Sequence, residues 1–311
     1  MTKWKYDDIP DQTGRVALVT GGPSGIGFQI ALMLAKKGAE VILTYRDLYK
    51  AQQANDKILL EHPKAKLTLV KLDLTDLASV SSSAVKVKTK YNQLDLLINN
   101  AGVMVPPFTK TAQGFELQIG TNHLGHFALT GQLLQLLIHT PGSRVISVSS
   151  LAAFIGKIDL DDLNYEYRSY KKWEAYGQSK LANLLFIREL SKRLAQHQLE
   201  TIAVASHPGG SPTNLQRTSS YFMKQILTPL ISQAPSAAAL PTLRAACDAA
   251  VLSGSYWGPS FFFGLKGNPE QAKIPGRALD ESVASRLWEL SEKLTGVVYD
   301  FKQDTKLYNQ K

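Results

Sequence analysis

The chain has 311 residues, of which 44% are hydrophobic and 20% charged, a composition that is normal for a folded globular protein and leaves ample length to bury a core. Its net charge is +9, yet the basic residues are scattered and no nucleic-acid-binding motif occurs, so we expect no nucleic acid partner.

Apolar, strand-like runs alternate with helical patterns along the chain. Strands are predicted near residues 15–20, 40–44, 67–72, 94–98, 143–149, 201–206 and 260–263. Helices are predicted near 25–37, 47–60, 76–90, 112–138, 173–196, 235–252 and 281–294. Runs such as LDLLIN and RVISVS are apolar enough to be buried on both faces, which is typical of a parallel sheet covered by helices. We therefore expect a single α/β domain over 1–311 with a Rossmann-like, doubly wound parallel sheet of about seven strands and helices on both faces.

A glycine-rich turn joins the first predicted strand to the first helix. Residues 21–27 read GGPSGIG, and the helical run FQIALMLAKKG follows. In this context the glycines let the backbone approach a pyrophosphate, while the helix N-terminus offers free N–H groups and a partial positive charge. The spacing is GxxxGxG, and Pro23 removes one N–H group from the loop. An ordinary strand-to-helix loop is the alternative interpretation.

Polar or glycine-containing segments also follow the later strands. They are Tyr45-Arg46, Asp73-Leu74, NNAG at 99–102, Ser149-Ser150 and His207-Pro208-Gly209. In a doubly wound sheet, ligands bind outside the carboxyl ends of the strands. The sequence therefore predicts one ligand site at that edge of the sheet.

The segment YGQSK at 176–180 begins a long predicted helix. A spacing of four places the Tyr176 phenol and the Lys180 ammonium on one helical face. A free tyrosine has a pKa of about 10, and a fixed positive charge beside it favours the phenolate and lowers that pKa. The pair therefore suits a proton donor and acceptor that works near neutral pH. A solvated chance pair is the alternative.

Together these ordered motifs resemble the short-chain dehydrogenase/reductase family, whose known members are NAD(P)-dependent oxidoreductases acting on alcohols and carbonyls. The motifs cover nearly the whole chain and are TGGPSGIG at 20–27, NNAG at 99–102, Ser149-Ser150, YGQSK at 176–180 and HPG at 207–209. NHLGHF at 122–127 and LWELSEKLTG at 287–296 are similar to the retinol dehydrogenase-like branch.

The resemblance implies a role for each matched residue. Tyr176 would be the general acid in reduction and the general base in oxidation, and Lys180 would lower its pKa and hold the nicotinamide ribose. Ser150 would bind the substrate oxygen, and Asn122 would hold a water that links Lys180 to solvent. The implied cofactor-binding residues are Tyr176 and Lys180 with Gly21, Ser24, Gly25, Ile26, Gly27, Arg46, Asp73, Leu74, Asn100, Ala101, Gly102, Pro208, Gly209 and Thr213.

NADP(H) is the expected cofactor, with NAD(H) as the alternative. An acidic residue just after the second strand would bind the adenosine ribose hydroxyls and favour NAD. Tyr45 stands at about that place, and Arg46 offers a charge-assisted contact to a 2′-phosphate. Asp47 follows and weakens this argument, although it also suits the N-cap of the next helix. The alternative for Asp73 is likewise a helix cap.

Two segments are expected to enclose the substrate, 151–175 and 210–234. The first carries Phe154, Tyr165, Tyr167, Tyr170 and Trp173, and the second corresponds to the mobile lid of the family. An apolar pocket between them would suit a lipophilic aldehyde, ketone or alcohol. Packing or an oligomer interface is the alternative use of these aromatic residues.

No metal site, no disulfide within the chain and no membrane-spanning segment are expected. Cys247 is the one cysteine and suits a core position, and His123, His126 and His207 are not spaced with carboxylates for a metal. No signal sequence and no apolar run of about 20 residues is visible, so the cytoplasm is the expected location. The resemblance implies a homodimer or homotetramer formed through the helices 112–138 and 173–196.

Two further functions fit parts of the sequence. Light-dependent protochlorophyllide reductase is a relative that is similar around NHLGHF and YxxxK, but it relies on a cysteine-containing pocket, against which Cys247 in a late helix argues. A non-catalytic NADP-binding sensor or scaffold would usually lose the Tyr, Lys or Ser of the site. This chain keeps all four residues of the site, Ser150, Tyr176, Lys180 and Asn122, which favours an enzyme over a sensor or scaffold.

Overall fold

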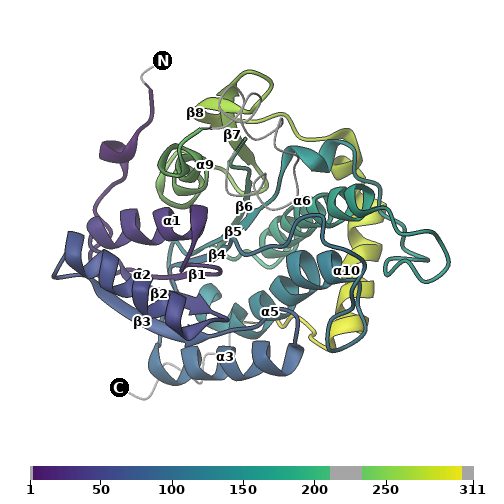
Figure 1. The fold of residues 1–311 in the computed structure, drawn as a ribbon, viewed down its shortest axis with the longest axis horizontal. Helices are drawn as coiled ribbons and strands as arrows, with labels where there is room; N and C mark the ends of the chain where they lie inside the picture. Colours follow the sequence, from purple (N-terminus) through teal and green to yellow (C-terminus); the bar gives the residue numbers. More distant parts are fainter. Residues whose placement is uncertain (1–2, 211–232, 303–311) are drawn as a thin grey trace.

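One sheet organises the part of the chain that the structure, a computed structural model, describes, which is residues 3–210 and 233–302. Its eight strands lie in the order β3-β2-β1-β4-β5-β6-β7-β8 (Figure 1). Strands β1 to β7 are parallel, and β8 pairs antiparallel with β7 at the edge. The strands are β1 Val16–Val19, β2 Glu40–Tyr45, β3 Lys66–Lys71, β4 Leu96–Asn99, β5 Arg144–Val148, β6 Ile202–Ser206, β7 Tyr256–Phe261 and β8 Lys266–Gln271. The doubly wound α/β fold is confirmed, with one strand more than expected.

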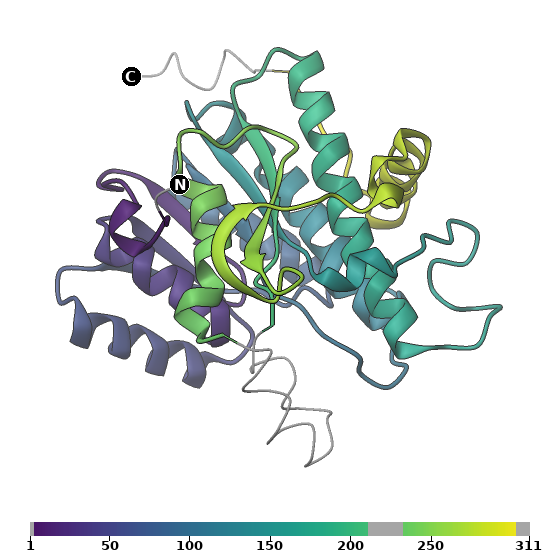
Figure 2. The same ribbon diagram turned by 90° about the horizontal axis from the view of Figure 1, so that it is seen from above.

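Helices cover both faces of the sheet (Figure 2). Successive residues of each inner strand enter different cores: Ala17 and Val19 of β1 belong to a core shared with α1 and α9, whereas Leu18 belongs to one shared with α5 and α6. Burial on both faces explains why these strands are continuous apolar runs in the sequence. The helices are α1 Gly25–Lys36, α2 Leu48–Glu61, α3 Leu77–Lys90, α4 Leu117–Ile119, α5 Gly125–Ile138, α6 Lys172–Gln196, α9 Pro235–Cys247 and α10 Glu281–Thr295. Short 3-10 turns lie at Tyr6–Asp8, Leu151–Phe154 and Gly276–Leu279.

The last predicted strand, 260–263, overlaps only the end of β7, and its second half lies in the turn after that strand. The structure has instead the hairpin of β7 and β8, whose sequences YWGPSF and KGNPEQ do not alternate cleanly between apolar and polar residues. Pro259 and Pro269 are tolerated because they lie opposite one another in this outermost pair of strands. The helix predicted over 235–252 ends at Cys247, where Asp248 turns to extended backbone.

The helix predicted over 112–138 begins later and is interrupted. Residues before it form a turn closed by a bridge between Lys110 and Glu116, and the Glu116 carboxylate then caps α4 by accepting from two backbone N–H groups. From Gly120 to Leu124 the helix widens into a π turn and continues as α5. Such π turns are frequent at functional sites, and this one contains Asn122.

The strand order reverses between the parallel neighbours β1 and β4, because the chain continues from β1 to β2 on one side and from β4 to β5 on the other. A crevice forms at such a switch point because the loops after the two strands diverge. Within residues 3–210 and 233–302, no helix combines the length and apolar character that crossing a bilayer requires.

Candidate active site

The glycine-rich turn after β1 can fit a pyrophosphate. Gly21 and Gly25 have φ of +68° and +57°, a region that favours glycine. A Cβ on Gly27 would lie 2.4 Å from the carbonyl oxygen of Gly21, so this glycine permits the helix to approach the turn closely. Ser24 is the N-cap of α1 but makes no side-chain cap hydrogen bond. The first N–H groups of α1 therefore remain available for a phosphate, as a dinucleotide would need.

A buried hydrogen-bond network joins this turn to the loop after β4 and to the π turn. The Thr20 hydroxyl oxygen accepts from the backbone N–H groups of Asn100 (2.8 Å) and Ala101 (2.9 Å) and lies 2.9 Å from Nε2 of His126. Nδ1 of His126 lies 3.0 Å from the carbonyl oxygen of Asn122, which can only accept, so Nδ1 carries a proton. Burial lowers the pKa of His126 to about 4, so the ring is neutral. Its Nε2 atom therefore accepts a hydrogen bond from the Thr20 hydroxyl.

Thr20 and His126 were not among the predicted site residues. The sequence signal that could have found them is the threonine that opens TGGPSGIG and the histidine four residues after Asn122, on the same helical face. Asn100 also holds the network, since its side-chain Nδ2 donates to the Thr20 carbonyl oxygen at 2.9 Å.

The side chains of Tyr176, Lys180 and Ser150 are brought together at the carboxyl edge of β5. Tyr176 and Lys180 lie in the N-terminal half of α6 and are buried, and the Tyr176 phenol is hydrogen-bonded to Ser150, the residue that follows β5 by two. The Lys180 ammonium lies 5.8 Å from the centre of the Tyr176 ring and donates to the Val148 carbonyl oxygen at 3.0 Å. The structure therefore places together the three groups that the sequence predicted.

The expected lowering of the Tyr176 pKa by Lys180 is not what the structure shows. Burial raises the pKa of Tyr176 to about 12, against a smaller lowering by the Ser150 hydrogen bond. Burial also lowers the pKa of Lys180 to about 8, because its ammonium faces the Val148 carbonyl and no carboxylate. Desolvation therefore outweighs the attraction between the two groups in this arrangement.

Asn122 is held close to Lys180 by the loop after β4. Its side-chain Oδ1 accepts from the Val103 N–H at 2.8 Å, and its Nδ2 donates to the Ser179 hydroxyl at 2.9 Å. A Cβ on Gly102 would lie 3.0 Å from Oδ1 of Asn122 and 3.5 Å from Nζ of Lys180, so all three lie around one small space. The NNAG segment thus contacts the catalytic candidates directly.

The other predicted cofactor residues lie at the same edge. Arg46 is exposed after β2, and Asp47 caps α2 by accepting from the Lys50 N–H, as its alternative interpretation held. Asp73 closes a turn by accepting from Thr75, whereas the cap of α3 is Asp76.

Leu74, Pro208 and Gly209 also occupy this edge. Leu74 is buried, with its carbonyl oxygen close to Gly125. Pro208 accepts from the Gln233 side chain, and Gly209 has φ of +71°. Thr213 and most of the segment 210–234 lie outside the described residues.

The aromatic residues of 151–175 divide into two groups. Tyr165 and Tyr170 pack against each other, and Arg168 lies 3.8 Å over the Tyr165 ring, so these two tyrosines serve packing. Trp173 is 48% exposed and meets the Tyr176 ring edge-on at 6.2 Å between centres. Trp173 therefore lies beside the Tyr176 ring, with about half of its side chain exposed.

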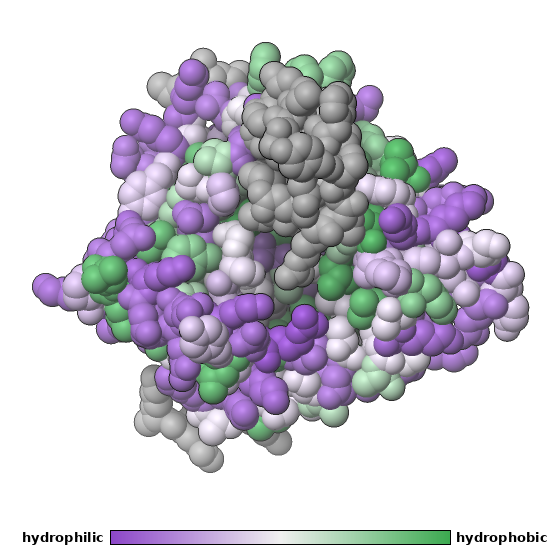
Figure 3. Space-filling model, in the orientation of Figure 1, coloured by the Kyte–Doolittle hydropathy of each residue, from purple (hydrophilic) through white to green (hydrophobic). Residues whose placement is uncertain are grey.

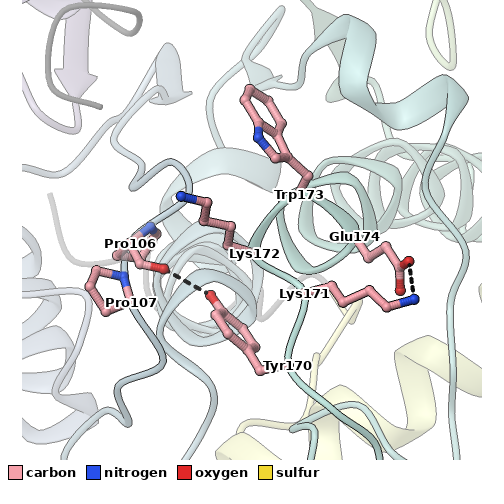
Figure 4. A pocket seen from close by; sticks show the side chains of 7 residues that line it. All are labelled: Pro106, Pro107, Tyr170, Lys171, Lys172, Trp173 and Glu174. Atoms are coloured by element: carbon pink, nitrogen blue, oxygen red, sulfur yellow. Dashed lines mark hydrogen bonds and ion pairs between the residues drawn. The ribbon is translucent and has the colours of Figure 1, made fainter. Parts of the chain in front are cut away.

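A shallow pocket of about 450 Å³ opens beside Trp173. It is lined by Pro106, Pro107, Tyr170, Lys171, Lys172, Trp173 and Glu174 (Figure 4). The Tyr170 hydroxyl donates to the Pro106 carbonyl oxygen across it, and Lys171 pairs with Glu174 on its other side (Figure 4). The walls of this pocket are partly apolar, and Lys172 lies at its rim. Most of its lining residues belong to the segment 151–175, which is expected to enclose the substrate.

Three buried histidines make the folded state sensitive to acid. Burial lowers the pKa of His123 to about 3 and those of His126 and His207 to about 4, whereas an unfolded histidine titrates near 6.5. Below that pH the unfolded chain binds protons that the folded chain does not. We expect the free energy of unfolding to fall with decreasing pH by about 1.4 kcal/mol per unit for each such histidine.

Urea unfolding between pH 7 and 5 measures this slope. In the His123→Gln variant, in which the amide can still contact the Ser291 hydroxyl that now lies 2.8 Å from Nε2, the slope should lose the part due to one proton. An unchanged slope in that variant would show that His123 does not titrate on unfolding.

Comparisons with known proteins identify the family of the chain. The family described as short chain dehydrogenase matches residues 15–223. Human retinol dehydrogenase 13 is 42% identical over 293 residues, which cover 91% of this chain and 85% of that protein. Human retinol dehydrogenase 12 is 38% identical over 290 residues, with 92% and 88% covered.

Solved structures show the same fold. A crystal structure of an uncharacterised protein from Mycobacterium paratuberculosis is 38% identical, has a TM-score of 0.81 and covers 96% of this chain and 100% of that chain. A short-chain dehydrogenase of Shigella flexneri, solved in complex with NADP, is 24% identical with a TM-score of 0.61, covering 79% and 97%. The chain belongs to the short-chain dehydrogenase/reductase family, in its retinol dehydrogenase-like branch, and is a hydride-transferring oxidoreductase that uses a nicotinamide cofactor.

Proposed function

We propose that the chain is an NADP(H)-dependent enzyme that interconverts lipophilic carbonyl compounds and alcohols, and that it works as one domain. The observation that carries the proposal is the buried Tyr176 phenol, hydrogen-bonded to Ser150 and followed one helical turn later by Lys180. These groups lie at the sheet edge to which the glycine-rich turn also belongs. A proton donor and a dinucleotide cradle therefore meet at one place.

Tyr176 and Ser150 act on the substrate oxygen in this proposal. When bound, the nicotinamide supplies or accepts the hydride at its C4 atom. During reduction negative charge grows on the carbonyl oxygen, and the hydroxyls of Tyr176 and Ser150 are donors that stabilise it. Tyr176 then gives its proton to that oxygen and, in oxidation, takes it back.

Lys180 and Asn122 support the phenol. The pKa of Lys180 is lowered to about 8, so the side chain is charged in neutral solution and can favour a Tyr176 phenolate once proton transfer has begun. Its other proposed task is to hold the nicotinamide ribose. Asn122 lies between Lys180 and the loop after β4, and its proposed task is to hold a water for proton exchange with solvent.

The cofactor-binding residues are proposed along the strand ends. The turn 21–27 holds the pyrophosphate, and the residues Asp73, Leu74, Asn100, Ala101, Gly102, Pro208, Gly209 and Thr213 complete the cleft. Arg46 is proposed to bind the 2′-phosphate of NADP(H). This is supported by its exposure after β2 and by the commitment of the neighbouring Asp47 carboxylate to capping α2.

Replacing Arg46 tests the cofactor preference. In Arg46→Ala, loss of a charge-assisted contact should raise the KM for NADPH by about 10–100-fold and leave the KM for NADH within a few-fold. Lys50→Ala is the matched control, because it removes an exposed cation in the first turn of α2. Steady-state kinetics with both cofactors measure the two effects, and an equal change for both cofactors would argue against a 2′-phosphate contact.

The proposed substrates are lipophilic. Two relatives are named retinol dehydrogenases, and Trp173 together with the partly apolar pocket beside it lies next to the phenol. NADPH consumption with a panel of carbonyl compounds that runs from short charged aldehydes to long apolar ones tests the assignment. Highest kcat/KM for the apolar members is expected, and a preference for small charged ones would refute it. Cofactor binding without turnover would instead support the sensor alternative. A homodimer or homotetramer in the cytoplasm stays a prediction.

A further inference from the structure

Residues 157–171 project from the molecule without a helix or strand of their own. They lie between the turn after β5 and helix α6, and they extend at the right of Figures 1 and 2. Figure 3, in the orientation of Figure 1, shows mainly hydrophilic and neutral residues on that side. A loop of this length inside a domain is usually either functional or disordered. Because it lacks the hydrogen bonds of a helix or a sheet, the segment needs side-chain contacts to keep one position.

Gln178 of α6 fixes this segment to the helix that carries Tyr176. Its side chain is fully buried, and its Oε1 atom accepts from Arg168 Nη2 at 2.9 Å and from the Asp159 N–H at 3.2 Å. Its Nε2 atom donates to the Leu163 carbonyl oxygen at 3.0 Å. Residues two apart in an α-helix point to different sides, so one side of α6 presents the phenol and another binds the segment.

Asp162 orders the inside of the segment. Its carboxylate accepts from the backbone N–H groups of Glu166, Tyr167 and Arg168 at 2.6, 3.3 and 3.1 Å. It also pairs with the Arg168 guanidinium at 3.4 Å, so Arg168 joins Asp162 to Gln178. Loss of the Gln178 amide would therefore loosen the whole segment and not a single side chain.

Gln118 of α4 joins the two walls of the pocket beside Trp173. Its side chain is fully buried, and its Oε1 atom accepts from the Val105 N–H at 2.9 Å. Its Nε2 atom donates to the Tyr170 hydroxyl and to the Lys172 carbonyl oxygen, both at 2.9 Å. Val105 directly precedes the two prolines of one wall, whereas Tyr170 and Lys172 belong to the other (Figure 4). One buried amide therefore sets how the two walls lie relative to each other.

The backbone at this contact is strained, and buried polar groups hold it. Val105 is β-branched, yet its φ is +48°, in the region that favours glycine. Such a conformation persists only where the surrounding structure holds it, here through the Gln118 amide. The buried Glu116 carboxylate adds a second restraint on Tyr170, whose hydroxyl lies 3.1 Å from its Oε1 atom. The walls of the pocket are therefore formed before any substrate binds.

We propose that Gln118 and Gln178 are positioning residues, which fix the walls of this pocket relative to Tyr176 and so favour long apolar substrates over short ones. Both amides are fully buried and act through the walls, without contact to the substrate. A preformed wall removes the entropy cost of ordering the segment around a bound chain. The gain applies to a chain long enough to reach the wall and not to a short aldehyde at the phenol. This role rests on the proposed function, because it takes the pocket to bind the apolar part of the substrate.

Kinetics of the full chain with two unbranched aldehydes test the positioning. Gln118→Leu and Gln178→Leu keep about the volume of each side chain and remove its hydrogen bonds. With NADPH, the ratio of kcat/KM for dodecanal to kcat/KM for propanal should fall about tenfold in each variant, because the KM for dodecanal rises. Loss of folded protein alone would lower both kcat/KM values by the same factor and would leave this substrate ratio unchanged.

Hydrogen exchange gives a readout that does not depend on turnover. The backbone amides of 157–171 should exchange faster in Gln178→Leu than in the wild type, while those of the turn 21–27 should keep their wild-type rates. This pattern would place the effect of the substitution in the substrate wall and not in the cofactor cleft.

Gln12→Leu is the matched control. Gln12 is also a buried glutamine, whose amide accepts from Arg15 Nη1 at 2.9 Å and donates to the carbonyl oxygens of Pro10 and Asp11 at 3.0 and 3.2 Å. It lies before β1, away from the carboxyl ends of the strands. Its loss should cost stability and leave the substrate ratio within twofold of the wild-type value.

Tyr170→Phe tests the Gln118 contact without a change to either glutamine. The variant keeps the ring that packs against Tyr165 and removes the hydroxyl that Gln118 binds. If the hydroxyl positions the wall, the substrate ratio falls. If Tyr170 only lines the pocket, a more apolar ring leaves the ratio unchanged or raises it. Tyr170→Phe therefore decides the test if the leucine variants do not fold.

Two kinds of result would overturn the positioning role while the proposed function stands. One is a substrate ratio that stays unchanged in the leucine variants or in Tyr170→Phe. The other is exchange of 157–171 at the wild-type rate in Gln178→Leu. If the wild type turns over no carbonyl compound at all, the proposed function fails, and the positioning role falls with it.

Discussion

Turnover should fall by roughly 10²–10⁴-fold when Tyr176 is replaced by phenylalanine, while the cofactor Kd changes by no more than a few-fold. The substitution removes one oxygen atom and keeps the ring, which packs edge-on against Trp173. What is lost is the proton that the phenol gives to the substrate oxygen and the hydrogen bond that it shares with Ser150. Steady-state kinetics with NADPH and an apolar aldehyde, together with fluorescence titration of the cofactor, measure both quantities.

Tyr91→Phe is the matched control. Tyr91 is also a buried tyrosine whose hydroxyl is hydrogen-bonded, to Glu40 and Thr68, but it lies at the end of α3, away from the site. Its loss should cost some stability and leave kcat unchanged. If Tyr176→Phe retained more than about a tenth of wild-type kcat, a proton donor other than the phenol would have to carry the reaction.

The sequence predicted the inner sheet because β1, β2 and β4 to β6 have one clear physical signature. Strands such as LLIN and VALV are buried on both faces, so nearly all of their residues are apolar and the pattern is distinct from that of a surface segment. The β7–β8 hairpin has no such signature. Its strands pair at the sheet edge, contain proline and glycine, and are joined by a turn of phenylalanines that no turn preference would select.

The site residues that belong to sequence motifs were predicted. Those whose role depends on their burial in the folded protein were not. Tyr176, Ser150 and the glycine-rich turn have fixed spacing in the sequence. His126 looks like one more helical histidine until the structure shows Thr20 on one ring nitrogen and the Asn122 carbonyl on the other. Likewise, the sign of the Tyr176 pKa shift depends on desolvation, which a helical spacing of four residues does not reveal.

Gly27→Ala should abolish measurable cofactor binding and lower the stability of the fold. A Cβ at this position would lie 2.4 Å from the Gly21 carbonyl oxygen and 2.6 Å from the Asn100 side-chain nitrogen. The first neighbour is backbone, so it cannot rotate away. The second donates to the Thr20 carbonyl oxygen and so holds the turn to the loop after β4. Helix α1 would have to move away from the turn, which would displace the N–H groups proposed to bind the pyrophosphate.

Gly276→Ala separates this effect from the general cost of losing a glycine. At Gly276 a Cβ would meet no atom within 4 Å, so the variant should bind cofactor as the wild type does. Fluorescence titration with NADPH gives the Kd, and thermal unfolding gives the stability of both variants. If Gly27→Ala only disturbed the packing of the core, it would lower the Tm, and the folded fraction of the variant would bind NADPH with the wild-type Kd. A displaced phosphate site raises that Kd by at least 100-fold even well below the Tm, since several backbone hydrogen bonds to charged oxygens are lost together. Retention of wild-type affinity in a folded Gly27→Ala protein would mean that the dinucleotide does not lie on this turn, and the assignment of the cofactor cleft would have to be given up.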